Sequence, residues 1–332
     1  MTKTFFIGAA AFFISVNGSK GQTLSEHTSM QRRGTIPLPN VDGRIDHIAF
    51  DSRRRTIFVA ALGNNTVEVI DVNKGKVTHT IKDLTEPQGV IFIPESNSIF
   101  VANGGNGECD VFNADSFLKT ASVKLSGDAD NVIYDRAENK IYVGYGNGGI
   151  AIIDANTFNL LAEIKLSGHP ESFQRDRSAK KMYVNVPGKH HIEVIDLGKL
   201  TVTDTWKMKG ASANFPMSLD ETRHRLFIGC RHPAKLLVLD TQTGETISSL
   251  DIDRDADDIF YDSSTKQIYV SCGEGYLDII KQNDANSYSV DGKLETHRGA
   301  RTSLFIPESN QLIVASPSDI NAEAQLLIYE RR

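Results

Sequence analysis

Short apolar runs alternate with turn residues along almost the whole chain, and they recur in a fixed order. Seven copies of one run begin at residues 56, 98, 140, 181, 225, 267 and 311, and they read "TIFVAALGN", "SIFVANGGN", "KIYVGYGNG", "KMYVNVPGK", "RLFIGCRHP", "QIYVSCGEG" and "QLIVASPSD". A second run such as "VEVIDV" follows several copies, and a third such as "DHIAFD" precedes each copy. The runs are short, rich in β-branched and aromatic residues and bounded by Gly, Asn, Asp and Pro, which predicts β-strands and no long helix.

The length of the repeat predicts the architecture. Each repeat spans about 42 residues and has room for four short strands, which is typical of one β-propeller blade. Seven repeats predict an all-β fold, a seven-bladed β-propeller of four-stranded antiparallel blades over residues 31–332. The last repeat ends after its third strand, so we expect residues 34–41, "GTIPLPNV", to supply the missing strand. This strand would close the ring and remove an exposed sheet edge.

The repeated runs also resemble a known family. "IYVGYGNG" followed by "IAIIDA", and the stretch "IFVAALGNNTVEVIDV", are similar to the YVTN-type β-propeller repeat, which is common in exported bacterial proteins. The resemblance covers residues 34–332 and implies the propeller fold. It implies no single activity, because similar propellers serve as scaffolds, as binding proteins and, more distantly, as lyases and lactonases.

The first residues predict export. Lys3 precedes an apolar stretch from Phe5 to Val16, and small residues follow, which is typical of a secretory signal peptide, here residues 1–21. A cytosolic protein with an apolar N-terminus is the alternative. The stretch is too short to span a bilayer, and no later segment is long and apolar enough to do so. We therefore expect a periplasmic or secreted protein without a membrane span.

The composition narrows the class of partner. The 332 residues are 40% hydrophobic and 23% charged, as in a globular protein with a substantial core. The net charge of −6 disfavours a nucleic-acid partner, which would favour a basic face. We expect a monomer that binds a small molecule or a protein. The 3 cysteines allow at most one internal disulfide, so the core has to provide the stability.

Residues that differ between repeats at equivalent positions indicate a site. In a propeller the first strand of each blade lines the central channel, and two sets of loops open on one face like a funnel. At the entrance of the seven first strands stand Asp46, Gln88, Asp130, Glu171, Phe215, Asp257 and Arg301, followed by His47, Gly89, Asn131, Ser172, Pro216, Asp258 and Thr302. The loops add Asn103, Tyr145, Asn185, Cys230, Arg231, Cys272 and Glu274.

A solvated channel would explain this polarity without any ligand. The mixture of carboxylates, histidine, amides and arginine around one axis favours a binding site instead. The expected ligand contacts are Asp46, Gln88, Asp130, Asn131, Asn103, Tyr145, Asn185, Asp257, Asp258, Arg231 and Arg301. Arginine binds carboxylate or phosphate in a forked geometry, so Arg231 and Arg301 favour an anionic ligand.

Cys230 and Cys272 occupy equivalent positions in neighbouring repeats. Three interpretations compete for them. They are two small buried residues at strand ends, or a disulfide between blades, or soft ligands of a divalent metal together with His47 and Asp257. The sequence has no CxxC or HxxxH spacing, so a metal site would have to be assembled from separate blades.

His169 and Glu171, in "GHPESF", are candidates for catalysis. A carboxylate near an imidazole at a funnel mouth can act as an acid–base pair, and His47 is the third candidate. Distantly similar propeller lyases use His and Glu in this region with a divalent cation, so the resemblance implies that cofactor here. We favour a propeller that binds a small molecule or partner at the funnel face. A metal-assisted lyase or hydrolase is the first alternative, and a protein-interaction platform is the second.

Overall fold

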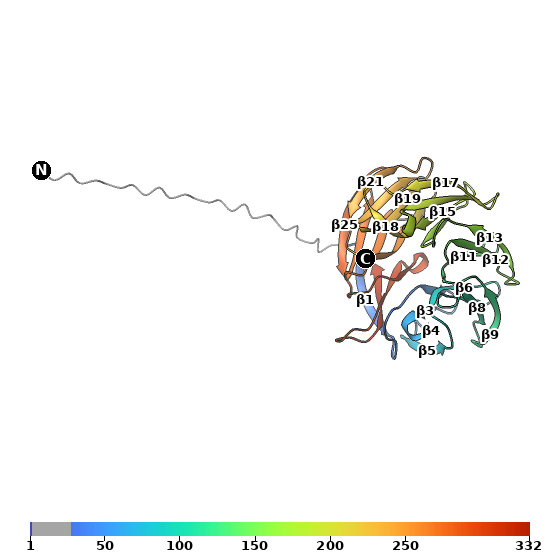
Figure 1. Cartoon of the computed structure of the whole chain (residues 1–332). Helices are drawn as coiled ribbons and strands as arrows, with labels where there is room; N and C mark the ends of the chain where they lie inside the picture. The colour runs from blue at the N-terminus through green and yellow to red at the C-terminus, as the bar shows by residue number, and fades with distance from the viewer. Residues whose placement is uncertain (2–27) are drawn as a thin grey trace.

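The computed structural model describes residue 1 and residues 28–332, and it folds these into seven four-stranded antiparallel sheets. The sheets follow one another around a ring in chain order, from blue to red in Figure 1. The predicted seven-bladed β-propeller is therefore confirmed. The predicted signal peptide, residues 1–21, falls almost wholly outside the described residues.

We number the blades in chain order from the first complete sheet. Blades 1 to 3 consist of β2 (Ile48–Asp51), β3 (Thr56–Ala61), β4 (Thr66–Asp71) and β5 (Lys76–Ile81); β6 (Pro87–Ile93), β7 (Ser98–Asn103), β8 (Glu108–Asn113) and β9 (Lys119–Lys124); and β10 (Ala129–Asp135), β11 (Lys140–Tyr145), β12 (Gly149–Asp154) and β13 (Leu160–Lys165). Blades 4 to 6 consist of β14 (Phe173–Asp176), β15 (Lys181–Val186), β16 (His191–Asp196) and β17 (Thr201–Lys207); β18 (Ser212–Asp220), β19 (Arg225–His232), β20 (Ala234–Asp240) and β21 (Thr246–Asp251); and β22 (Ala256–Asp262), β23 (Gln267–Cys272), β24 (Tyr276–Gln282) and β25 (Tyr288–Glu295). Three short 3-10 helices interrupt the loops: η1 (Leu62–Asn64), η2 (Pro187–Lys189) and η3 (Pro307–Ser309).

Blade 7 joins the two ends of the described chain. It consists of β26 (Ser303–Ile306), β27 (Gln311–Ser316) and β28 (Gln325–Arg331), with β1 (Met30–Pro37) as the outer strand. β1 runs antiparallel to β28, from Met30 opposite Arg331 to Pro37 opposite Gln325, and Figure 1 shows it beside the C-terminus. The predicted closure is confirmed, although the strand begins four residues earlier than 34 and ends at 37.

The core lies between the blades. The buried apolar side chains form seven clusters, and each cluster combines two neighbouring blades around the ring. Large side chains such as Phe100, Tyr142 and Phe227 are almost completely buried in these layers. Burial of one such side chain contributes about 1.5–3 kcal/mol, so the layers hold the ring rigid and fix the inner strand ends around the axis.

Aspartates that recur at the strand ends serve the turns. Asp51 and Asp135, at the ends of β2 and β10, accept backbone hydrogen bonds from Arg53 at 2.9 Å and Ala137 at 2.8 Å. Asp71 and Asp154 accept similar bonds after β4 and β12. Among the described residues there is no helix of a length and apolarity that would cross a membrane.

Candidate functional site

The backbone at the inner end of each blade leaves regular strand pairing at the ring of side chains around the channel mouth. In blades 2, 3, 5 and 6 the register of the first strand shifts at the ring, as it does between Ala129 and Val132 in β10. Such bulges bend a strand and redirect its side chains. In blades 1, 4 and 7 the ring residues precede the first strand, which begins only at Ile48, Phe173 and Ser303.

Two cavities occupy the axis. The one at the mouth has about 20 Å³, enough for one water-sized group, and its lining consists of Arg44, Asp46, His47, Asp130, Asn131, Glu171, Ser172, Phe215 and Asp257. The one in the channel has about 270 Å³ and includes Asp258 in a largely apolar wall. His47, Asn131 and Ser172 line both cavities, so the mouth adjoins the channel.

The first part of the mouth, which we call the histidine side, consists of Asp46 and His47 from blade 1, Asp130 from blade 3, and His169 and Glu171 from blade 4. The His47 Nε2 atom lies 3.8 Å from Asp46 Oδ1 and 3.8 Å from Asp130 Oδ1. The other Asp130 oxygen, Oδ2, lies 3.9 Å from His169 Nε2. These separations are too long for hydrogen bonds.

Backbone contacts fix the two residues from blade 4. The Glu171 N–H donates to the Asn185 carbonyl at 2.9 Å, which ties the loop before β14 to β15. The His169 Nδ1 atom lies 2.6 Å from the Gly146 carbonyl of the neighbouring blade and 3.5 Å from Asp128 Oδ2. The Gly146 backbone has a φ of +59°, a conformation that glycine adopts without strain.

Burial and the close approach of several charged groups shift the pKa values of the residues on the histidine side. Burial, and next the Asp130 carboxylate, raise the pKa of Glu171 to about 8. Burial also raises the pKa of Asp46, to about 6. Burial lowers the pKa of His47, but the Asp46 and Asp258 carboxylates outweigh this effect and raise the pKa to about 9. Burial likewise opposes protonation of His169, whereas Asp130 and the Gly146 carbonyl raise the pKa to about 9.

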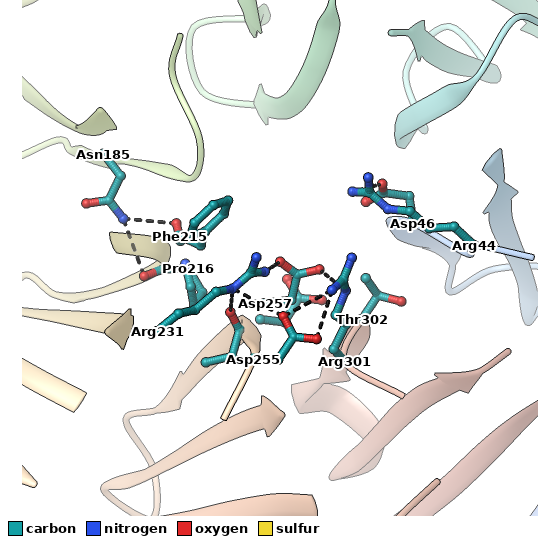
Figure 2. A network of polar contacts seen from close by, with 12 residues as sticks. Arg44, Asp46, Asn185, Phe215, Pro216, Arg231, Asp255, Asp257, Arg301 and Thr302 are labelled. Atoms are coloured by element: carbon teal, nitrogen blue, oxygen red, sulfur yellow. Dashed lines mark hydrogen bonds and ion pairs between the residues drawn. The ribbon is translucent and has the colours of Figure 1, made fainter. Parts of the chain in front are cut away.

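The second part, which we call the arginine side, consists of Arg231 from blade 5, Asp255 and Asp257 from blade 6, and Arg301 from blade 7. Figure 2 shows both guanidinium groups pointing at the same two carboxylates. Arg301 Nη1 donates to Asp255 at 2.8 Å, and Arg301 Nε lies 2.9 Å from Asp257 Oδ2. Arg231 Nη2 donates to Asp257, and Arg231 Nε donates to the Ala256 carbonyl at 3.0 Å.

The two arginines are therefore already paired within the protein. The Arg231 guanidinium carbon also lies 3.8 Å from the centre of the Phe215 ring, a cation–π contact. Burial raises the pKa of Asp257, and Arg301 and Arg231 act against that rise. Both arginines contact protein carboxylates, which weakens the expectation that they bind an anionic ligand. Across the axis, Arg44 Nη2 pairs with Asp46 Oδ2 at 2.7 Å (Figure 2).

Asp258 lies next to the arginine side but faces the channel cavity. It accepts a hydrogen bond from the Ser303 N–H at 2.6 Å, which links blade 6 to blade 7. Burial raises the pKa of Asp258 to about 7, although the nearby His47 opposes this rise. Asp258 thus has a role in the packing of the ring as well as a place in the channel wall.

Four further predicted ligand contacts also bond within the protein. Asn103, Tyr145, Asn185 and Gln88 hydrogen-bond to the Glu108 carbonyl, Glu163, the Phe215 carbonyl and Asp128, respectively. Asn103 and Asn185 are fully buried, which suits them to holding turns and blades in place. Of the predicted ligand contacts, Asn103 and Asn185 are therefore the two that the geometry supports least.

Cys230 and Cys272 lie in two different apolar layers, one between blades 4 and 5 and the other between blades 5 and 6. Both are fully buried and free, so the disulfide interpretation is wrong in this structure. Burial raises the pKa of Cys230 to about 12 and that of Cys272 higher still. Neither belongs to a group of metal-capable side chains among the described residues, so the geometry favours the interpretation as small core residues over metal ligation with His47 and Asp257.

Comparisons with known proteins support the fold. A chain in a structure titled "Crystal Structure of Mitotic Checkpoint Complex" superposes with a TM-score of 0.77 at 14% identity, and the match covers 98% of each chain. A chain of Kuenenia stuttgartiensis hydrazine synthase superposes with a TM-score of 0.73 at 15% identity, over 85% of this chain and 96% of that one. No family model and no curated protein sequence matches the chain. At such low identity these similarities show the fold alone. Propellers commonly serve as binding or interaction platforms.

Two residues of the channel mouth were missing from the sequence prediction. Asp128 contacts both Gln88 and His169, and Asp255 bridges the two arginines. Each stands two residues before a ring position, in the tripeptide "DAD" that begins at 128 and again at 255. Because residues two apart along an extended chain share a face, this repetition was the signal that could have found them.

In the part of the chain that the structure describes, two groups of three side chains bring their ligand atoms within 4.8 Å of one another, and so could hold a metal ion: Asp46, His47 and Asp130, and Asp130, His169 and Glu171. Asp130 is common to both groups. All five residues were predicted at the funnel from the ring alignment or the "GHPESF" motif. The structure therefore concentrates the predicted chemistry on the histidine side and leaves the arginine side as a closed network of ion pairs.

Proposed function

We propose that the protein binds a small, positively charged or donor-rich ligand on the histidine side of the channel mouth. The observation that carries this proposal is the state of the Asp130 and Glu171 carboxylates. Both line the mouth cavity, and neither accepts a hydrogen bond from any residue in the described part of the chain. A buried carboxylate without a hydrogen bond is costly, and the histidine contacts at 3.8 and 3.9 Å offset only part of that cost, so a ligand that supplies positive charge or donors would be favoured there.

The test is a thermal-shift screen of the purified protein against divalent cations, polyamines and amino sugars, with anionic metabolites for comparison. We expect stabilisation by members of the cationic classes and its loss in Glu171→Gln. Glu274→Gln is the matched control, because Glu274 stands on a loop of blade 6 and pairs with Arg254 outside the cavity. Equal shifts in Glu171→Gln and the wild type would contradict the proposal.

We further propose that the chain belongs to the YVTN-type repeat family and that it is exported. The seven repeats of the "IYVGYGNG" type support the family, and the apolar stretch from Phe5 to Val16 supports export. The intact mass of the protein recovered from the periplasm or medium tests export. A mass that lacks residues near 1–21 is the expected result, and a full-length cytosolic protein would contradict it.

A metal-assisted lyase or hydrolase is the second candidate function. The observation that favours it is the proximity of Glu171 to His169, two groups whose pKa values are both displaced toward neutrality or above it. An enzyme predicts that Glu171→Gln abolishes turnover in a hydrolase and lyase substrate panel without lowering the melting temperature. A pure binding protein predicts no turnover by the wild type in any member of that panel.

A further inference from the structure

We propose that one divalent transition-metal ion binds at the channel mouth, held by Asp130, His169 and Glu171. The inference rests on the proposed binding role of the histidine side and names the chemistry of that site. The three residues come from two blades, and one ligand atom of each lies within 4.8 Å of the other two.

The orientation of His169 is the first support. Its Nδ1 atom lies 2.6 Å from the Gly146 carbonyl, which can only accept, so the proton resides on Nδ1. In the neutral ring this leaves the Nε2 lone pair 3.9 Å from Asp130 Oδ2. Either a second proton on the ring or a cation between the two atoms satisfies this arrangement, and the Nδ1 contact leaves Nε2 free for the cation. An imidazole that donates its other N–H to a backbone carbonyl is the usual arrangement of a metal-bound histidine.

The separation between these two atoms suits an ion. Zinc-like ions lie about 2.0–2.2 Å from histidine nitrogen and carboxylate oxygen, so two ligands of one ion are at most about 4.2 Å apart. The 3.9 Å between Nε2 and Oδ2 is within that limit and is too long for a hydrogen bond.

The state of Asp130 is the second, independent support. This residue is only 7% exposed, and its carboxylate accepts no hydrogen bond within the described part of the chain. Its two oxygens face two different histidines, at 3.8 Å to His47 and 3.9 Å to His169. A buried carboxylate without a hydrogen bond is unfavourable, these long histidine contacts offset only part of the cost, and coordination of a cation would offset more of it.

The neighbouring group of Asp46, His47 and Asp130 is the weaker candidate for the ion. Asp46 already pairs with the Arg44 guanidinium at 2.7 Å, and this fixed positive charge would repel a cation. No arginine or lysine pairs with Glu171 or with the Asp130 carboxylate among the described residues. The geometry therefore assigns the ion to the blade 4 side of Asp130.

The donor set indicates the class of ion. One imidazole nitrogen and two carboxylate oxygens suit Zn²⁺, Co²⁺ or Mn²⁺, whereas Ca²⁺ takes six to eight oxygen ligands. Three protein ligands leave a fourth position open. The cavity beside Asp130 and Glu171 has about 20 Å³, so a water molecule or one atom of a small ligand fits at that position.

The experiment is a titration of the purified, EDTA-treated and dialysed protein with Co²⁺, followed by calorimetry and by visible absorption. We expect one Co²⁺ per chain with the absorption bands of a protein-bound ion, and displacement by Zn²⁺. Loss of a supporting outer-shell group costs about 10–100-fold in affinity, so His169→Gln and Asp130→Asn should weaken binding by at least that factor. Glu171→Gln provides a third variant if one of these does not fold.

The controls decide between the assignments. His191→Gln removes a histidine of the same blade that contacts Ser167 and Glu193, and it should leave binding unchanged. Unchanged binding in His169→Gln, or a loss confined to His47→Gln, would overturn the assignment to Asp130, His169 and Glu171. Absence of saturable Co²⁺ and Zn²⁺ binding would overturn the site altogether, and a proton on His169 would then be the occupant.

The failure of this inference can be told apart from the failure of the proposed function. Stabilisation by an organic cation in the presence of EDTA, without Co²⁺ binding, would keep the binding role and refute the metal. Co²⁺ binding at a chain that responds to no organic ligand, with or without the ion, would establish the metal and refute the small-molecule role.

Discussion

Both sides of the channel mouth include positions of the same ring, yet they differ in how their charges are satisfied. On the arginine side Asp255 and Asp257 are held by two guanidinium groups at distances of 2.8 to 3.4 Å, apart from one shorter contact. On the histidine side the nearest approaches to Asp130 are 3.8 and 3.9 Å. The charges of the arginine side are paired within the protein, whereas Asp130 on the histidine side has only long contacts, and this difference underlies the proposal that a ligand binds there.

Loss of Arg301 should have the largest effect, because it breaks the ion-pair network of the arginine side. Arg301→Met would leave Asp257, whose side chain is only 15% exposed, with Arg231 alone. Removal of one partner from a buried ion pair costs about 3–5 kcal/mol, and we expect a loss of about 3 kcal/mol in the free energy of unfolding. Urea denaturation measures it. A double-mutant cycle with Asp257→Asn should recover part of the loss, and an unchanged midpoint would show that the network is not structural.

A smaller effect is expected on the histidine side. Asp130→Asn removes a charge that is repelled by nearby carboxylates but attracted by His47 and His169, so the stability of the metal-free protein should change by less than about 1 kcal/mol. The same change should abolish ligand binding. Thermal unfolding in EDTA checks the stability, and a loss as large as that of Arg301→Met would mean that Asp130 is held by the protein as tightly as Asp257 and that the two sides are alike.

The pH dependence of Asp258 sharpens the comparison, because this residue adjoins the arginine side without an arginine partner. Its pKa is raised from 3.8 to about 7, so the folded state binds the proton more tightly than the unfolded state does. Stability therefore falls as the pH rises from about 4 through 7. Asp258→Asn retains an acceptor for the Ser303 N–H and mimics the protonated acid. We expect it to flatten this decline and to stabilise by about 1 kcal/mol above pH 7.

Measurements at both ends of that range provide the control. Below about pH 4 the wild-type acid is protonated in the folded state, so the two proteins should unfold at the same temperature. A parallel pH profile for Asp258→Asn and the wild type would show that other groups cause the decline.

Most of the fold could be predicted from the sequence because a propeller repeats one unit. Seven similar runs fix the number of blades, and the incomplete last repeat indicates where the ring closes. The ring alignment also brought His47, Asp130 and Glu171 to one mouth. The pairing across the axis could not be predicted, because it depends on bulges and on the reach of side chains from non-adjacent blades. Asp130 of blade 3 meets His47 of blade 1, a relation that no spacing along the chain reveals.

Residues at the ends of the second strands show a second limit of prediction from sequence. Asn185 and Cys230 lie near the ends of the second strands of blades 4 and 5, and position alone made them equal to Arg231 as candidates. In the structure the Asn185 amide bonds the Phe215 carbonyl and Cys230 packs in an apolar layer, whereas Arg231 reaches the neighbouring blade. Whether a side chain at a strand end turns inward or toward the mouth is decided by the local packing, which one sequence does not display.

The smallest effect is expected at Glu274. This residue was predicted on the funnel face, but it does not line the cavity at the channel mouth. Glu274 bonds the Arg254 guanidinium at 2.5 Å, and Arg254 is itself highly exposed, so water can replace each partner. Exposed pairs of this kind contribute little to stability. Glu274→Gln should therefore leave the melting temperature and the Co²⁺ affinity unchanged within error. A loss of Co²⁺ affinity in this variant would mean that the negative field of the whole face, rather than the three residues around Asp130, attracts the cation, and a lower affinity at high salt would then accompany it.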